Sequence, residues 1–378
     1  MNNADLYYLN GKILALETGN ILKEDIVNAL SSEDFPWMRW INVTGNHLIQ
    51  QTIYAILSRA GLLHLLPPEI KEHLFMVYDL NRKRNIELSE QIKDINNILS
   101  GAGIFPVYMK GAGNIIDGLY RDPAERLMLD IDFLVHDEEW ERAAATLLKN
   151  GYLAQREYDP GKMRYEKHYP RLYRPGFPFF VEIHRLVVPD EYSGHFSPET
   201  AFAEIRHPAR IEQCYVLSEK HAVFQNFIHS QLQHKSHLYA RTFLRNLHDL
   251  LMLSRKTDVF KDLQELEAYP RQKAGYVDVF CKTFSLPEPA YPYPKGYRHL
   301  YARRYDAVLR SKFFSRTNFF FVFLFDRLLP KIYRSYIKMP FRAIYNKDVR
   351  RHLKNRLKDP GIMKKQLKFF QKIFSGKY

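Results

Sequence analysis

The chain has 378 residues and a formal net charge of +14, and this length predicts about two or three domains with a substantial hydrophobic core. Its two cysteines, Cys214 and Cys281, lie far apart, which excludes a disulfide framework or a cysteine-spaced metal site and indicates a reducing compartment. The N-terminus lacks a signal peptide pattern, and no stretch approaches the ~20 apolar residues of a spanning helix, so we expect a cytoplasmic protein.

Residues 1 to 100 are predicted to be helical, with a break at Pro67-Pro68. Between residues 85 and 103 the apolar positions fall at helical spacing, and a Gly-Ala-Gly sequence ends the run. These apolar positions are Leu88, Ile92, Ile95 and Leu99. We expect a supporting helix here that leads into the first strand.

A Lys-Gly-Ala-Gly loop is predicted between a strand at 104 to 109 and a helix at 114 to 120. Backbone amides and a helix N-terminus at such a place favour a phosphate group. The Gly-Lys-Ser/Thr ending of a Walker loop is missing. Lys110, Gly111 and Ala112 are therefore candidates for phosphate binding, with a solvated Lys110 as the alternative.

The next predicted strand carries Asp130 and Asp132 within an apolar run. Successive side chains of a strand point to opposite faces, so the two carboxylates share one face, roughly 6 to 7 Å apart along the strand. Burying two like charges without partners is costly, and a divalent cation such as Mg²⁺ is the natural partner. The alternative is a strand end whose aspartates face solvent.

A cluster of acidic residues at 137 to 139 predicts the start of a helix that ends near Lys149. Two β-rich runs follow, at 163 to 174 and 179 to 188, and the Pro-Gly-Phe-Pro between them predicts an antiparallel hairpin. Glu182 and His184 share one face of the second run. If this strand lies beside the Asp130–Asp132 strand, three carboxylates converge.

Taken in order, the Lys-Gly pair, Arg126, the Asp-x-Asp sequence with its apolar Phe-Leu-Val, and the later Glu182 and His184 resemble the uncharacterised nucleotidyltransferase family of the DNA polymerase β-like superfamily. The resemblance covers roughly residues 35 to 255. It departs from the superfamily in two places. An alanine replaces the usual serine after Gly111, and the longer interval before Asp130 predicts an extra loop around residues 121 to 123.

The resemblance implies a metal-dependent nucleotidyltransferase with Asp130, Asp132 and Glu182 as its catalytic and metal-binding residues. Two Mg²⁺ ions about 3.5 to 4 Å apart would assist attack of an acceptor hydroxyl on the α-phosphorus of ATP or another nucleoside triphosphate, releasing pyrophosphate. Glu182 would also help to take up the hydroxyl proton. Lys110 and Arg126 would bind the triphosphate, although Arg126 could instead pair with Glu125 or Asp122.

Residues 199 to 289 are again predicted to be helical. Several histidines occur there, but His229 and His234 are five residues apart, so we expect them on different helical faces and predict no dedicated metal site. The segment from Thr242 to Leu250 resembles the helical part that follows the catalytic domain in this family. Arg245 and Asp249 are therefore possible cleft residues, although helix packing explains them equally well. His184 is a further possible cleft residue that could orient Glu182 or an acceptor, with a purely structural histidine as the alternative.

The positive charge is concentrated in residues 291 to 378, which contain 23 Lys or Arg against 4 acidic residues, so residues 1 to 290 carry a net charge of −5. Seven consecutive apolar residues, Phe319 to Phe325, are too few to span a bilayer. Further on, Met363, Leu367, Phe370 and Phe374 stand at helical spacing among lysines. Such a basic amphipathic helix suits an anionic membrane surface, packing on the protein, or, less well, a nucleic acid.

These features predict an α+β protein with a small mixed β-sheet nucleotidyltransferase core between helical regions. The expected regions are 1–100 (helical), 101–190 (α/β core), 191–290 (helical) and 291–378 (basic, amphipathic). The leading function is transfer of a nucleoside monophosphate to a hydroxyl of a small molecule, saccharide or peptide. Alternatives are a toxin-like enzyme that modifies RNA or a tRNA end, a phosphotransferase, and a non-catalytic nucleotide-binding module attached peripherally to the inner face of the membrane.

Overall fold

The computed structural model describes residues 1–158, 166–287, 289, 295–333, 338–347 and 350. The chain divides into two compact units, Met1–Ser311 and Lys312–Tyr378. The three regions predicted within residues 1–290 all fall in the first unit. The second contains α17 (Lys312–Phe323), η6 (Leu324–Leu328), α18 (Leu329–Ile332) and α19 (Met339–Tyr345). The amphipathic helix predicted around Met363 to Phe374 lies outside the described residues.

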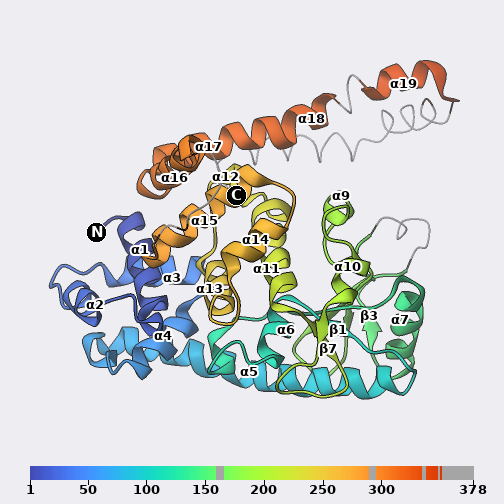
Figure 1. Cartoon of the computed structure of the whole chain (residues 1–378), viewed down its shortest axis with the longest axis horizontal. Helices are drawn as coiled ribbons and strands as arrows, with labels where there is room; N and C mark the ends of the chain where they lie inside the picture. Colours follow the sequence, from blue (N-terminus) through green and yellow to red (C-terminus); the bar gives the residue numbers. More distant parts are fainter. Residues whose placement is uncertain (159–165, 288, 290–294, 334–337, 348–349, 351–378) are drawn as a thin grey trace. The chain divides into compact units, whose positions relative to one another are not determined.

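The first unit begins with a group of helices. They are α1 (Asn3–Leu14), α2 (Lys23–Leu30), α3 (Trp37–Asn46), α4 (Gln50–Arg59) and α5 (Pro68–Ser100). The predicted break at Pro67-Pro68 is confirmed, because Pro68 is the first residue of α5, where its missing N–H has no helical partner to lose. The predicted supporting helix is the second half of this 33-residue helix, and its four apolar residues are fully buried. Figure 1 shows α5 running from α4 along the first unit to α7 (Trp140–Lys149).

A mixed sheet of seven strands forms the core of the first unit, in the order β3-β4-β5-β2-β1-β7-β6. The strands are β1 (Val107–Tyr108), β2 (Asp130–Leu134), β3 (Leu153–Ala154), β4 (Leu172–Tyr173), β5 (Phe180–His184), β6 (Ile205–Arg206) and β7 (Tyr215–Leu217). The predicted hairpin is confirmed where it is described, since β4 and β5 are antiparallel. With helices on either side of this sheet in the sequence, the α+β prediction is confirmed.

The C-terminal part of the first unit is helical. It contains α9 (Asp190–Ser193), α10 (Pro198–Ala203), α11 (Glu219–Phe227), the π-helix η5 (Ile228–Gln233), α12 (Ser236–Tyr239), α13 (Leu244–Leu253), α14 (Val259–Glu265), α15 (Pro270–Phe284) and α16 (Lys295–Arg310). The helix α11 contacts α13 and α14, and its π-helical continuation η5 contacts α12. These helices therefore form one packed group. Among the described residues, no helix is long and apolar enough to cross a membrane.

The prediction of a loop at Lys110 to Gly113 was wrong, because these residues form the first turn of α6 (Lys110–Ile116). Gly113 permits this geometry, since a Cβ there would lie 2.7 Å from the backbone carbonyl oxygen of Tyr108 in β1. The interval before Asp130, where an extra loop around residues 121 to 123 is predicted, contains the short 3-10 helix η3 (Pro123–Glu125). Side chains of α5 hold it, and Asn85 donates to the carbonyl oxygen of Arg126 at 2.7 Å.

We predict that Gly113→Ala lowers the free energy of unfolding by about 1 to 3 kcal/mol, because the added methyl group forces α6 away from β1. Urea denaturation measures this change. Gly194→Ala is the matched control, since its Cβ would have nothing within 4 Å and its φ is −63°. Equal stability of the two variants would show that α6 and β1 are not packed as closely as described.

Candidate active site

Three carboxylates meet on one face of the sheet because β2 and β5 are adjacent and parallel. Their register pairs Asp132 with Glu182 and Leu134 with His184, so Asp130, Asp132, Glu182 and His184 share a face. The residues that alternate with them, Ile131 and Phe133, are fully buried on the opposite face. The period of two along both strands therefore brings the acids together, while the apolar residues anchor the strands in the core.

Asp132 lies at the centre of this cluster and is only 2% exposed. Nζ of Lys110 donates to Oδ1 of Asp132 at 2.5 Å, and Nε2 of His184 lies 2.8 Å from the same oxygen. Burial alone would raise the pKa of Asp132, but the Lys110 ammonium and the His184 ring hold it well below its usual range. Asp132 is therefore an ionised carboxylate in a nearly water-free setting.

Glu182 and Asp130 share a second cation, Arg171, whose Nε donates to Oε1 of Glu182 at 2.6 Å and whose Nη2 lies 3.4 Å from Oδ2 of Asp130. Burial opposes ionisation of Glu182, yet the His184 contact brings its pKa down to about 2. Asp130 behaves oppositely, because burial and repulsion from Asp132 raise its pKa. The three carboxylates are thus electrostatically coupled, with Lys110 and Arg171 balancing their charge.

The donor set suits a hard divalent cation. Ligand atoms of Asp132, Glu182 and His184 lie within 4.8 Å of one another, and all three residues are buried. Asp130 extends the same face with a further carboxylate. Carboxylate oxygens are the ligands that Mg²⁺ prefers, so the residues at this site fit the ion that the resemblance implies. His184 is the additional potential ligand, and its other ring nitrogen, Nδ1, is buried without a hydrogen-bond partner in the described part of the chain.

Lys110 reaches the acids from a strained backbone position. Its φ is +51°, in the left-handed region that non-glycine residues seldom adopt, and such strain costs of order 1 to 2 kcal/mol. The Lys110 N–H donates to Oε1 of Gln225 at 3.0 Å, and the side chain is held by Asp132. Gly111 follows, where a Cβ would lie 2.4 Å from Sδ of Met128. Ala112 is fully buried and does not line the cavity in front of the acids.

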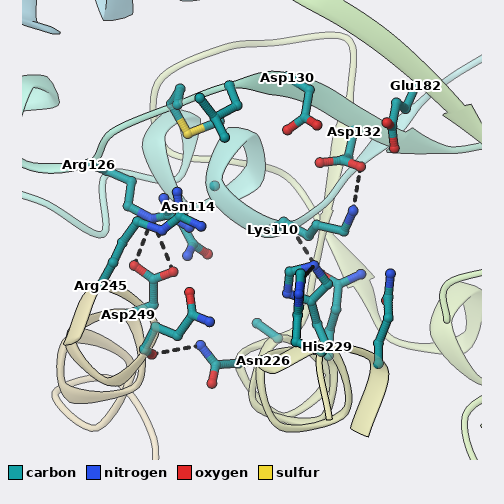
Figure 2. Close-up of a pocket in the computed structure, with 18 of the residues that line it drawn as sticks. Lys110, Asn114, Arg126, Asp130, Asp132, Glu182, Asn226, His229, Arg245 and Asp249 are labelled. Carbon is teal, nitrogen blue, oxygen red and sulfur yellow. Dashed lines mark hydrogen bonds and ion pairs between the residues drawn. The ribbon is translucent and has the colours of Figure 1, made fainter. Parts of the chain in front are cut away.

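A cavity of about 390 Å³ opens in front of the carboxylates, lined by β2, α6, α11, η5 and α13 (Figure 2). The candidates Lys110, Gly111, Arg126, Arg245 and Asp249 all line it together with the three acids. His184 lies just behind the acids, with no exposed surface. The candidate residues other than Ala112 thus gather at one place, although they come from widely separated parts of the sequence.

Arg126 and Asp249 form a buried ion pair at the end of the cavity away from Glu182 (Figure 2). Nε of Arg126 donates to both carboxylate oxygens of Asp249, at 2.8 and 3.1 Å, and the Tyr120 hydroxyl donates to the same carboxylate. The alternative that Arg126 pairs with its sequence neighbours was wrong. Glu125 instead pairs with Arg59, and Asp122 accepts from Tyr78.

Several lining residues were not identified from the sequence. Lys167, His168 and Arg171 lie on the segment that precedes β4, and Asn114, Gln225, Asn226 and Gln233 come from helices. Arg171 had a usable signal, because it lies in the β-rich run predicted to pair with the strand of Glu182. Burial and repulsion from Lys110 lower the pKa of Lys167 to about 8. The helical residues carry no periodic pattern that distinguishes a cavity wall from a packed face.

The prediction that His229 and His234 lie on different helical faces was wrong. Residues 228 to 233 form a π-helix, whose wider turn brings residues five apart into line. The two Nε2 atoms lie 3.1 Å apart, with one ring donating and the other accepting, and the ring planes meet edge to face. Both rings line the cavity, where desolvation and the positive charge of Lys110 lower the pKa of each.

The chain matches a known protein family over much of its length. Residues 33–272 match the family described as Uncharacterised nucleotidyltransferase, a stretch that includes more than half of the chain and all of the candidate residues. The resemblance inferred from the Lys-Gly, Asp-x-Asp and Glu-x-His sequences is confirmed, over slightly more of the chain than those sequences suggested. No curated protein matches the chain.

Proposed function

Since the chain belongs to the uncharacterised nucleotidyltransferase family, we propose that it transfers a nucleoside monophosphate from a nucleoside triphosphate to a hydroxyl group of a small molecule, saccharide or peptide. The observation that carries this proposal is the convergence of Asp130, Asp132 and Glu182 on one face of two adjacent parallel strands, at the wall of a cavity. The cations around this cavity suit a polyphosphate substrate.

Asp130, Asp132 and Glu182 are the residues that would hold Mg²⁺, with two ions expected. Bound Mg²⁺ would neutralise phosphate charge and lower the pKa of the acceptor hydroxyl. The low pKa of Glu182 keeps it ionised, which suits a cation ligand better than the proton acceptor suggested from the sequence. Lys110, Gly111, Ala112 and Arg126 are proposed nucleotide-binding residues, and of these only Ala112 is away from the cavity.

In the proposed reaction, the acceptor oxygen forms a bond to the α-phosphorus while the bond from that phosphorus to the bridging oxygen breaks. Pyrophosphate leaves with the electron pair, and the hydroxyl proton passes to solvent. The side chains contribute mainly by positioning and by charge compensation. Lys110 meets the phosphates as a point charge and Arg126 as a planar fork.

The test is release of pyrophosphate from each of the four NTPs, in the presence of Mg²⁺ and a fractionated cell lysate that supplies acceptors. We expect release that depends on protein, lysate fraction and Mg²⁺ together, and that EDTA stops. Fractions treated with ribonuclease distinguish a small-molecule or peptide acceptor from RNA. Release of orthophosphate without pyrophosphate would contradict nucleotidyl transfer.

We also propose that the second unit attaches peripherally to an anionic membrane surface. The helix α17 and the segment after it expose large aromatic side chains: Phe313 is 73% exposed, Phe321 51% and Phe325 64%. Cationic residues such as Lys312 and Arg316 alternate with them on the same elements. Exposed aromatic groups beside lysines and arginines match the interface of an anionic bilayer, where apolar groups enter the acyl boundary and cations meet the headgroups.

We predict that the double variant Phe313→Ser/Phe325→Ser weakens binding to anionic vesicles by about 10- to 100-fold. Fully burying a phenylalanine ring contributes ~1.5 to 3 kcal/mol of free energy, and each substitution removes the part of it that the ring gains in the bilayer. Flotation with phosphatidylserine-containing vesicles and with phosphatidylcholine vesicles measures it. Phe75→Ser is the control, since Phe75 is 48% exposed on α5 of the first unit. Vesicle binding that is unchanged in the double variant would refute the membrane assignment. So would a wild-type protein that binds RNA but not anionic vesicles.

A further inference from the structure

The charges around the cavity do not cancel. Its described lining includes five cationic side chains, Lys110, Arg126, Lys167, Arg171 and Arg245, and four carboxylates, Asp130, Asp132, Glu182 and Asp249. Lys110 pairs with Asp132, Arg171 with Glu182, and Arg126 with Asp249. Lys167, Arg245 and Asp130 remain, and Asp130 also lies 3.4 Å from Arg171. Of the two remaining cations, Arg245 is the one at the end of the cavity that contains the Arg126–Asp249 pair (Figure 2).

Arg245 has no compensating partner within the described parts of the chain. Its Nε is buried without a hydrogen bond, and no carboxylate lies within ion-pair distance of its guanidinium. Asp249, one helical turn away on α13, is already occupied by Arg126 and Tyr120. Burial and the nearby Arg126 lower the pKa of Arg245 to about 10, which leaves it positively charged at neutral pH. Arg245 as a whole is partly buried, and a charge in such a setting is costly unless an anion joins it.

Arg126 and Arg245 approach the same space from different elements (Figure 2). Arg126 comes from the extended stretch that leads into β2, and Arg245 from α13. The cavity wall between Arg126 and Asp130 is formed by Leu127, Met128 and Leu129. Four extended residues span at most about 13 Å, so the backbones of Arg126 and Asp130 are no more than about 13 Å apart in the wall of the same cavity.

We propose that Arg245 and Arg126 together bind the terminal phosphate groups of the nucleoside triphosphate, with Asp249 as the residue that positions Arg126. This assignment rests on the proposed transferase function and adds Arg245 to its binding residues. Nε of Arg126 already donates to Asp249 and its Nη1 to the carbonyl oxygen of Leu127, so Nη2 of Arg126 and the guanidinium of Arg245 are the groups that would meet phosphate oxygens. They would hold the pyrophosphate part while the α-phosphate lies at the carboxylates. The structure thus favours a substrate with a polyphosphate chain over one with a single phosphate group.

The test compares full-length wild-type protein with Arg245→Gln in calorimetric titrations with inorganic tripolyphosphate, orthophosphate, an NTP and the matching NMP, in Mg²⁺ buffer. We expect Arg245→Gln to bind tripolyphosphate and the NTP about 10- to 100-fold more weakly, with little change for the NMP, because a hydrogen bond to a charged group is lost. Arg255→Gln is the matched control, since it removes the same charge from an exposed position just after α13.

Thermal unfolding adds a readout that does not depend on activity. Removing a partly buried charge that has no ion-pair partner leaves Arg245→Gln at least as stable as wild type, whereas tripolyphosphate stabilises it less than it stabilises wild type. Unchanged tripolyphosphate affinity in Arg245→Gln overturns the assignment. If Arg245→Gln loses as much affinity for orthophosphate and NMP as for tripolyphosphate, the assignment is also overturned. The site would then bind a single phosphate group, such as one on the acceptor. Tripolyphosphate binding through Arg245 without nucleotidyl transfer would refute the proposed reaction but not this site.

Discussion

Replacing Asp132 with Asn is expected to lower nucleotidyl transfer by about 10²- to 10³-fold or more, a loss typical of removing one electrostatic contact to the reacting groups. Asp132 is the carboxylate nearest to Lys110 and His184 and the register partner of Glu182, so its charge affects every other group of the cluster. Asn keeps the size and a carbonyl oxygen of the side chain. The change therefore removes charge without opening a cavity.

Steady-state transfer rates, measured together with melting temperatures, separate a loss of chemistry from a loss of fold in this variant. Asp137→Asn is the matched control, because Asp137 lies just beyond β2 with a side chain that is 71% exposed. It should leave the rate unchanged. If Asp132→Asn retained activity within about twofold of the control, the carboxylates would not form the catalytic centre.

Asp249→Ala is expected to lower the free energy of unfolding by about 3 to 5 kcal/mol, because it leaves the buried guanidinium of Arg126 without its partner and next to that of Arg245. In the Arg126–Asp249 pair the two side chains are only 9% and 7% exposed. Urea denaturation measures the loss. Transfer should also fall, because Arg126 would no longer be held in place at the cavity.

The exposed pair Lys12–Asp25 provides the control for this experiment. Its side chains are 37% and 46% exposed, so Asp25→Ala should cost no more than about 1 kcal/mol. The double variant Asp249→Ala/Arg126→Met should recover part of the stability lost in Asp249→Ala, since the unpaired charge disappears with it. A double variant less stable than Asp249→Ala would show that the penalty does not come from an uncompensated charge.

The parts of the fold that could be predicted from the sequence have strong local periodicity. The apolar spacing of Leu88, Ile92, Ile95 and Leu99 specifies the buried face of α5, and these residues are buried. Along β2 and β5 the alternation of acidic and apolar residues specifies which side chains share a face. The alternation alone does not bring Asp132 and Glu182 together. They meet because β2 and β5 are adjacent and their register pairs these two residues.

Other features of the site depend on contacts that no local pattern encodes. Arg126 is separated from Asp249 by 123 positions, and sequence neighbours such as Glu125 looked like equally good partners. The His229–His234 contact depends on a π-helix, which the usual helical period does not anticipate. Lys110 is the first residue of α6 with a positive φ, a conformation that a lysine adopts only where tertiary contacts enforce it.

Whether Asp130, Asp132 and Glu182 form a nucleotidyl transfer centre is tested most directly by the fate of the label in parallel incubations with α- and γ-labelled NTP. With Mg²⁺ and acceptor fractions, wild-type protein should place the α-label on an acceptor and release the γ-label in pyrophosphate. The Asp130→Asn/Asp132→Asn protein should do neither. Transfer of the γ-label to the acceptor, or α-label transfer that persists in the double variant, would contradict the assignment.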